Sequence, residues 1–165
     1  IKHHETKELT DKYLSTYITT VDGNFQRQLA SALSYTKNET TLTHLLEEWK
    51  NKDIVKPQDL AMSWYFTFLQ HDFTQGTVWT WARDNWDWIK AALGGDMSFD
   101  KFVIYPASTF KTYERLAEYK AFFEPQLSDL AISRNISMGI KEISARIDLI
   151  DKEKAAVEAA IKATV

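Results

Sequence analysis

Apolar residues recur every three or four positions along most of the chain, which is the spacing of one face of an α-helix. The clearest case lies near the end, where six isoleucines are separated by 4, 4, 3, 4 and 3 residues: Ile132, Ile136, Ile140, Ile143, Ile147 and Ile150. This stripe predicts a long helix over about residues 128–149 with one buried face. Gly139 lies inside it at a cost of roughly 1 kcal/mol relative to alanine, which predicts a bend or a close helix contact there.

The same periodicity predicts further helices over residues 5–19, 25–35, 38–49, 57–70, 74–93, 98–106 and 112–125. Asn38, Ser98 and Thr112 are expected N-caps, and Asp151 is expected to cap a final separate helix. Pro57 suits the first position of a helix, because its missing N–H would be unpaired there anyway. The pair Gly94-Gly95 is expected to end the helix before it in a left-handed conformation.

These predicted helices are short and are joined by tight turns. The chain holds five glycines and three prolines, and most of them fall between the helical segments. The pattern predicts an all-α fold of eight or nine helices in successive antiparallel pairs. Such an arrangement is typical of an α-solenoid of the HEAT or armadillo kind. The length of 165 residues favours a single domain over the whole chain.

Charge and composition exclude several classes of partner. The chain has 20 Lys and Arg against 23 Asp and Glu, a formal charge of -3, and no extended basic cluster; we expect neither nucleic acid nor membrane binding. The apolar stretch over residues 60–69 is too short to cross a bilayer. The absence of cysteine favours a reducing compartment, so a cytoplasmic location is predicted. The sequence begins with neither Met nor the apolar central region of a signal peptide, which predicts that the chain is a piece of a longer polypeptide.

No catalytic motif is visible. A zinc peptidase helix needs His-Glu-x-x-His, and the one opening of that motif, His4-Glu5, has Glu8 where the second histidine should be. The chain also lacks a cysteine nucleophile and a Gly-x-Ser-x-Gly elbow. We therefore predict no catalytic, cofactor or metal residues in this chain. Six tryptophans, four of them within residues 79–88, predict core packing on more than one side of a helix.

A series of short motifs follows one order along the chain. They are Val55-Lys56-Pro57-Gln58-Asp59-Leu60, Trp79-Thr80-Trp81, Asn85-Trp86-Asp87-Trp88-Ile89, Gly94-Gly95-Asp96-Met97, Phe110-Lys111-Thr112, Glu114-Arg115-Leu116-Ala117-Glu118, Ala121-Phe122-Phe123-Glu124-Pro125 and Leu149-Ile150-Asp151-Lys152-Glu153-Lys154-Ala155-Ala156-Val157. In this order the motifs resemble the C-terminal domain of the M1 family of zinc aminopeptidases. The closing stretch resembles the aminopeptidase N type of lactic-acid and related bacteria. The likeness covers the chain from about Val55 onward and is looser before it.

The resemblance implies that the chain is the later part of a helical domain that packs against an upstream catalytic domain. That domain would hold the zinc and the hydrolytic residues, and the helical domain would enclose the active-site chamber and limit the access of peptides. In such a wall, basic side chains can attract the carboxylate end of a bound peptide. The candidates are Lys56, Arg83, Lys111 and Arg115, with Gln58 as a polar neighbour.

Two other functions stay open from the sequence. A free-standing helical-repeat module that binds a partner protein in its groove is the main alternative, because solenoids are often used in this way. A helical enzyme with an unrecognised acid-base site is the weaker one. The candidate carboxylates, Glu47-Glu48 and Asp84 with Asp87, are more typical of solvated helix faces.

Overall fold

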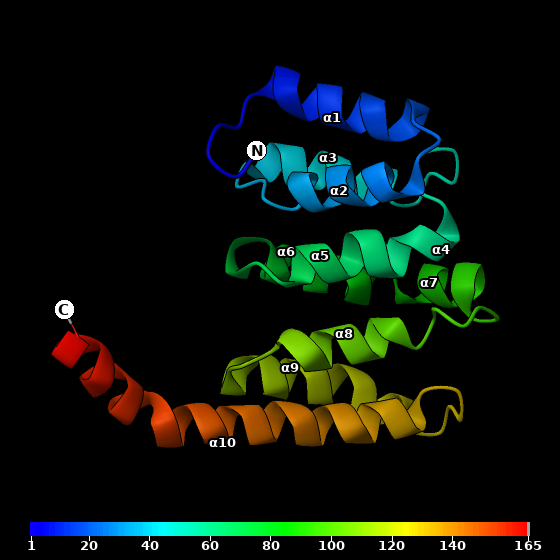
Figure 1. Ribbon diagram of the computed structural model, residues 1–165. Coiled ribbons are helices and arrows are strands. Elements are labelled where there is room, and N and C mark those ends of the chain that lie inside the picture. The colour runs from blue at the N-terminus through cyan, green and yellow to red at the C-terminus, as the bar shows by residue number, and fades with distance from the viewer. Residues whose placement is uncertain (165) are drawn as a thin grey trace. The chain divides into compact units, whose positions relative to one another are not determined.

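The computed structural model describes residues 1–164, with side chains through Ala163. It divides into two compact units, residues 1–102 and 103–165. All regular structure in the described residues is helical, as the periodicity predicts. Figure 1 shows the elements in chain order.

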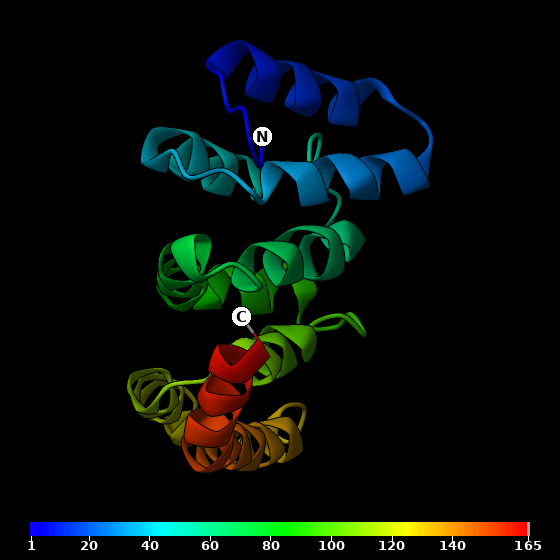
Figure 2. The same cartoon turned by 60° about the vertical axis from the view of Figure 1, so that its left-hand side comes forward.

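The first unit begins with an antiparallel pair, α1 (Lys7–Thr19) and α2 (Gly23–Leu33), which lie side by side in Figures 1 and 2. The elements that follow are α3 (Glu39–Glu48), α4 (Pro57–Asp59), the π-helix η1 (Leu60–Phe66), α5 (Thr67–Leu69), α6 (Asp72–Asp84) and α7 (Trp86–Leu93). The expected signals at Asn38 and Pro57 are confirmed. The Asn38 side chain accepts a hydrogen bond from the Thr41 amide, and Pro57 is the first residue of α4.

Aromatic side chains form the core of the first unit. Trp49 and Trp64 are almost completely buried, and the Trp64 indole N–H donates to the Tyr17 hydroxyl over 3.0 Å. Trp49 also packs edge-on against Phe68, with 5.4 Å between ring centres. Because aromatic pairs at such angles add to the energy of burial, this cluster ties α1, α3 and the η1–α5 segment together.

Three details of the first unit differ from the sequence prediction. The helix expected over residues 74–93 is interrupted at Asn85, whose backbone leaves the helical region at φ -109° and ψ 18°. Its side-chain amide donates to the Trp81 carbonyl over 2.7 Å, which satisfies one oxygen at the end of α6. Gly94 ends α7 in the right-handed region at φ -60°, so the expected left-handed ending is wrong. The segment 60–66 is a π-helix, a form that periodicity does not distinguish from α.

The second unit is built from α8 (Lys101–Thr109, whose first two residues belong to the first unit), α9 (Tyr113–Phe123), the short 3₁₀ turn η2 (Glu124–Gln126) and α10 (Ser133–Thr164). Thr112 caps α9 as expected, accepting from the Arg115 amide. α9 and α10 run antiparallel and pack together (Figure 1). The core of this unit includes Tyr119, Phe123 and Ile136, each completely buried.

Four predicted boundaries of α8 and α10 are wrong. α8 begins at Lys101, three residues after the expected cap Ser98, and α10 begins at Ser133 rather than near residue 128. Pro106 lies inside α8 rather than ending it. Asp151 does not start a new helix, because α10 continues through it; its carboxylate instead accepts a hydrogen bond from the Tyr113 hydroxyl over 3.1 Å. The residues after Asp151 include no glycine or proline and several alanines, so the helix has no reason to stop there.

Candidate functional site

Lys56 and Gln58 lie at the start of α4 and are both exposed. Lys56 is the N-cap, with extended backbone at φ -64° and ψ 141°, and Pro57 then fixes the first helical residue. The chain enters the helix at this point, which leaves both side chains on the surface.

Arg83, the third candidate of the first unit, is half-buried on α6 and has partners within the unit. Its Nη2 atom donates to the Thr80 hydroxyl over 3.1 Å, and its guanidinium carbon lies 5.3 Å from the centre of the Trp79 ring. A cation over an indole is attracted to the negative face of the ring. These contacts fix Arg83 against α6, so it is less free than Lys56 to reach a ligand.

The other two candidates belong to the second unit. Lys111 is exposed in the turn between α8 and α9, and Arg115 is in the first turn of α9. The Arg115 guanidinium lies 2.7 Å from the Glu118 carboxylate and 5.9 Å from the centre of the Phe110 ring. This ion pair is partly exposed and contributes little stability. The five candidates are thus divided between the units, with Lys56, Gln58 and Arg83 in the first.

A hollow that the sequence did not reveal lies between α1 and α2. It is open to solvent, has a volume of about 750 Å³ and is lined by Ile1, Lys2, Tyr13, Asn24, Arg27, Gln28, Ser31, Ala32 and Tyr35. The Lys2 ammonium lies 5.2 Å from the centre of the Tyr35 ring, and Arg27 donates to the Asn24 side chain. The hollow therefore combines two cations with aromatic and amide groups and no carboxylate. Its residues come from three segments, the N-terminus, α1 and the stretch from α2 to Tyr35, and periodicity alone does not align them.

A second hollow of about 470 Å³ lies between α3 and α6. Its lining residues are Thr43, Leu46, Glu47, Lys50, Thr77, Thr80, Trp81, Asp84 and Asn85. Trp81 is half-buried, packs edge-on against Trp49 at 5.0 Å and lies 6.2 Å from Trp88. The clustered tryptophans thus pack on more than one side of their helices, as predicted, and Trp81 also reaches the surface.

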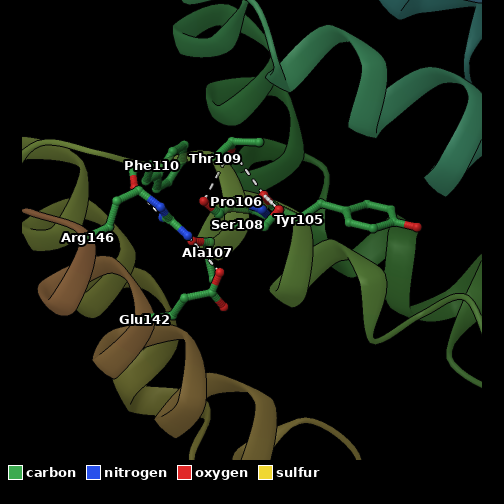
Figure 3. A network of polar contacts seen from close by, with 8 residues as sticks. All are labelled: Tyr105, Pro106, Ala107, Ser108, Thr109, Phe110, Glu142 and Arg146. Carbon is green, nitrogen blue, oxygen red and sulfur yellow. Dashed lines mark hydrogen bonds and ion pairs between the residues drawn. The ribbon is translucent and has the colours of Figure 1, made fainter. Parts of the chain in front are cut away.

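The polar contacts around Arg146 form a network inside the second unit, shown in Figure 3. Its Nη1 atom donates to the carbonyl oxygens of Ala107 (2.8 Å) and Phe110 (2.7 Å), and its Nη2 atom donates to Glu142 over 2.7 Å. The two carbonyls belong to the end of α8, where oxygens lack helical partners and a positive charge is favourable. The network holds α8 against α10, and we therefore interpret it as a structural contact.

Burial shifts the pKa of His71 and the pKa of Tyr119. His71 precedes α6, its Nε2 lies 3.1 Å from the Ser34 hydroxyl, and its ring stacks on Phe73 at 5.2 Å. Burial, followed by the charge of Lys2, lowers the pKa of His71 below its ordinary value. Burial likewise raises the pKa of Tyr119, whose hydroxyl donates to the Val103 carbonyl over 3.1 Å. Both groups have packing partners that explain the shifts.

Within residues 1–164, no three His, Cys, Asp or Glu side chains come together in a group that could hold a metal ion. Glu5 of the incomplete His4-Glu5 motif is engaged elsewhere, since its carboxylate accepts from the Thr36 hydroxyl and from the Lys37 amide. In the same part of the chain, no helix is long and apolar enough to cross a membrane.

The helical fold and the ordered motifs agree with comparison to known families. Residues 1–145 match the family described as the ERAP1-like C-terminal domain. The chain therefore belongs to this family of C-terminal helical domains, which is part of the M1 aminopeptidases.

The similar proteins are aminopeptidases. Aminopeptidase N of Lactococcus lactis subsp. lactis is 58% identical over 162 residues, and aminopeptidase N of Lactobacillus helveticus is 39% identical over 161 residues; each match covers 98% of this chain. Endoplasmic reticulum aminopeptidase 2 of Bos taurus is 30% identical over 115 residues, covering 67% of this chain and 12% of that protein. The chain spans 19% of the length of the two bacterial relatives.

Proposed function

We propose that this chain is the later part of the C-terminal helical domain of a zinc-dependent aminopeptidase that removes residues from the N-terminus of peptides. The observation that carries the proposal is the match over 98% of the chain to proteins named aminopeptidase N. Both compact units would belong to that one domain. The partner would be the upstream catalytic domain of the same polypeptide, acting in the cytoplasm.

The role of the chain would be to enclose the active-site chamber and to restrict which peptides enter it. A wall of paired helices suits this role because its elements are rigid and its surface is hollowed, as between α1 and α2 and between α3 and α6. No three potential zinc ligands come together in the part of the chain that the structure describes, and in this proposal the zinc and the hydrolytic step belong to the rest of the polypeptide. Zinc there would polarise the scissile carbonyl and activate water.

In this role, the exposed Lys56 and Lys111 side chains would contribute to attraction of the peptide carboxylate, with Gln58 as a neighbouring hydrogen-bond donor. Arg83 and Arg115 would act from fixed positions, since each is already in contact with an aromatic ring. Attraction between an exposed cation and a carboxylate is screened by salt. The contribution should therefore weaken as ionic strength rises.

The test is the dependence of hydrolysis on peptide length. The whole enzyme and a variant that lacks the region equivalent to this chain would be given peptides of increasing length with the same N-terminal residue. We expect the whole enzyme to lose activity on long peptides and the shortened variant to lose that discrimination. Cleavage of a small aminoacyl reporter by both proteins would establish that the catalytic domain is intact. The same length profile in both would contradict an enclosing role.

A further inference from the structure

The hollow between α3 and α6 combines an indole ring with two carboxylates. Trp81 of α6 is half-buried in its wall, and Glu47 of α3 and Asp84 of α6 are exposed residues that line it. The two helices pack against each other within the first unit. The hollow is open to solvent and has a volume of about 470 Å³, so a side chain of another molecule has room to enter it.

The Trp81 ring is held in place by two other aromatic side chains. Trp49, which is 1% exposed, packs edge-on against it with 5.0 Å between ring centres, and the Trp88 ring lies 6.2 Å away. A ring fixed in this way loses little conformational freedom when a ligand binds to it. Among aromatic side chains, the indole attracts cations to its face most strongly. Trp81 therefore provides a rigid surface for a positive charge.

The two carboxylates are free to accept hydrogen bonds from a ligand. In the part of the chain that the structure describes, neither the Glu47 nor the Asp84 carboxylate has a hydrogen bond or an ion pair. Lys50 is the one lysine or arginine among the lining residues, and its ammonium lies 5.9 Å from the centre of the Trp88 ring. Negative charge therefore predominates in the lining of the hollow.

These features favour an organic cation over a metal ion. Hard cations such as Ca²⁺ need six or more oxygen ligands, and an indole ring supplies none. A guanidinium is planar, stacks on aromatic rings and presents five N–H donors, whereas an ammonium is compact and strongly hydrated. An arginine side chain thus matches the indole and the two carboxylates better than a lysine side chain does.

We propose that this hollow binds an arginine side chain of a peptide, with the guanidinium against Trp81 and its N–H groups donating to Glu47 and Asp84. The helical domain thereby distinguishes peptides by a basic residue as well as by length. The inference rests on the proposed function, because that function makes peptides the ligands of the enzyme.

Isothermal titration calorimetry on the whole enzyme tests this site. The probes are peptides with a reduced first peptide bond, which cannot be hydrolysed there, and with either arginine or citrulline at each position in turn from the third to the eighth. Citrulline keeps the shape of the arginine side chain and lacks its charge. We expect arginine to bind about five- to tenfold more tightly than citrulline at one or more positions. Glu47→Gln and Asp84→Asn should each reduce that ratio about twofold or more.

Asp87→Asn is the matched control, since it removes a carboxylate from an exposed position that does not line the hollow. It should leave the ratio unchanged. Equal affinities for arginine and citrulline at every position would overturn the inference, and this wild-type comparison stands even if a variant fails to fold. A ratio that neither Glu47→Gln nor Asp84→Asn lowers would also overturn it. Equal affinities in an enzyme that still rejects long peptides would remove this site alone and leave the enclosing role intact.

Discussion

Gly139 of α10 lies directly against Tyr119 of α9. A Cβ atom built on Gly139 would be 2.9 Å from Cζ of the Tyr119 ring and 2.8 Å from the Ala107 side chain, both too close for real contacts. The sequence predicted a bend or a close helix contact at this glycine. The structure shows the close contact and identifies the neighbours.

Gly139→Ala should therefore destabilise the protein despite the better helix propensity of alanine. Overpacking typically costs about 1 to 3 kcal/mol, and a gain of roughly 1 kcal/mol from propensity offsets only part of it. Thermal unfolding would measure the change. Gly95→Ala is the control, because nothing lies within 4 Å of its added methyl group. Equal melting temperatures for the two variants would refute the packing argument.

Arg146→Met should weaken the second unit by removing the donors to Ala107 and Phe110 while keeping much of the side-chain volume. Hydrogen bonds from charged groups contribute about 1.5 to 3 kcal/mol, and we expect the lower end because the Arg146 side chain is 27% exposed. Urea unfolding would report the loss. Arg134→Met, at an exposed position of the same helix, should change stability by much less; a comparable loss there would argue against the network.

His71 predicts a pH dependence of stability. Its pKa is lowered in the folded protein, first by burial and then by Lys2, so the unfolded chain binds the proton more readily. The contribution of neutral His71 to the free energy of unfolding is complete above the pKa of the unfolded chain, about 6.5. This contribution is lost as the pH falls toward the lower pKa of His71 in the folded protein. His71→Gln should flatten stability over this acidic range, whereas His44→Gln, at an exposed position, should not. A curve unchanged by His71→Gln would rule out this origin.

Lys56→Ala and Lys111→Ala should raise the KM of the whole enzyme for peptides with a free C-terminal carboxylate. Each variant loses one attraction between an exposed cation and the peptide carboxylate, which salt screens. We therefore expect KM to rise by a few fold at low salt. Peptides with an amidated C-terminus provide the comparison and should be affected much less. An equal rise for both kinds of peptide would show that the lysines do not act on the carboxylate.

The sequence correctly predicted some of the features that local chemistry decides. The caps at Asn38 and Thr112 and the helix start at Pro57 depend on a few neighbouring residues and were correct. The break at Asn85, the continuity through Asp151 and the inclusion of Pro106 in α8 were missed. At Asn85, where α6 ends, the side chain donates a hydrogen bond to the Trp81 carbonyl. Neither this bond nor the hydrogen bonds from Arg146 to Ala107 and Phe110 can be recognised from the spacing of apolar residues.

The arrangement of the candidate side chains was not predictable from the sequence. Family resemblance selected the basic residues, and the structure shows that Arg83 and Arg115 are already engaged while Lys56 is exposed. The hollow around Arg27 and Tyr35 depends on how α1 packs on α2. Because its residues are spread over three segments, no linear motif marks it.

The most direct test of the central claim is photo-crosslinking of a bound peptide in the whole enzyme. The peptide would carry a photoreactive group near its C-terminus, and the products would be mapped by mass spectrometry. An enclosing wall predicts crosslinks within this chain, at or near residues 56–58, 83 or 111–115, that excess unlabelled peptide abolishes. Crosslinks confined to the rest of the polypeptide would contradict it.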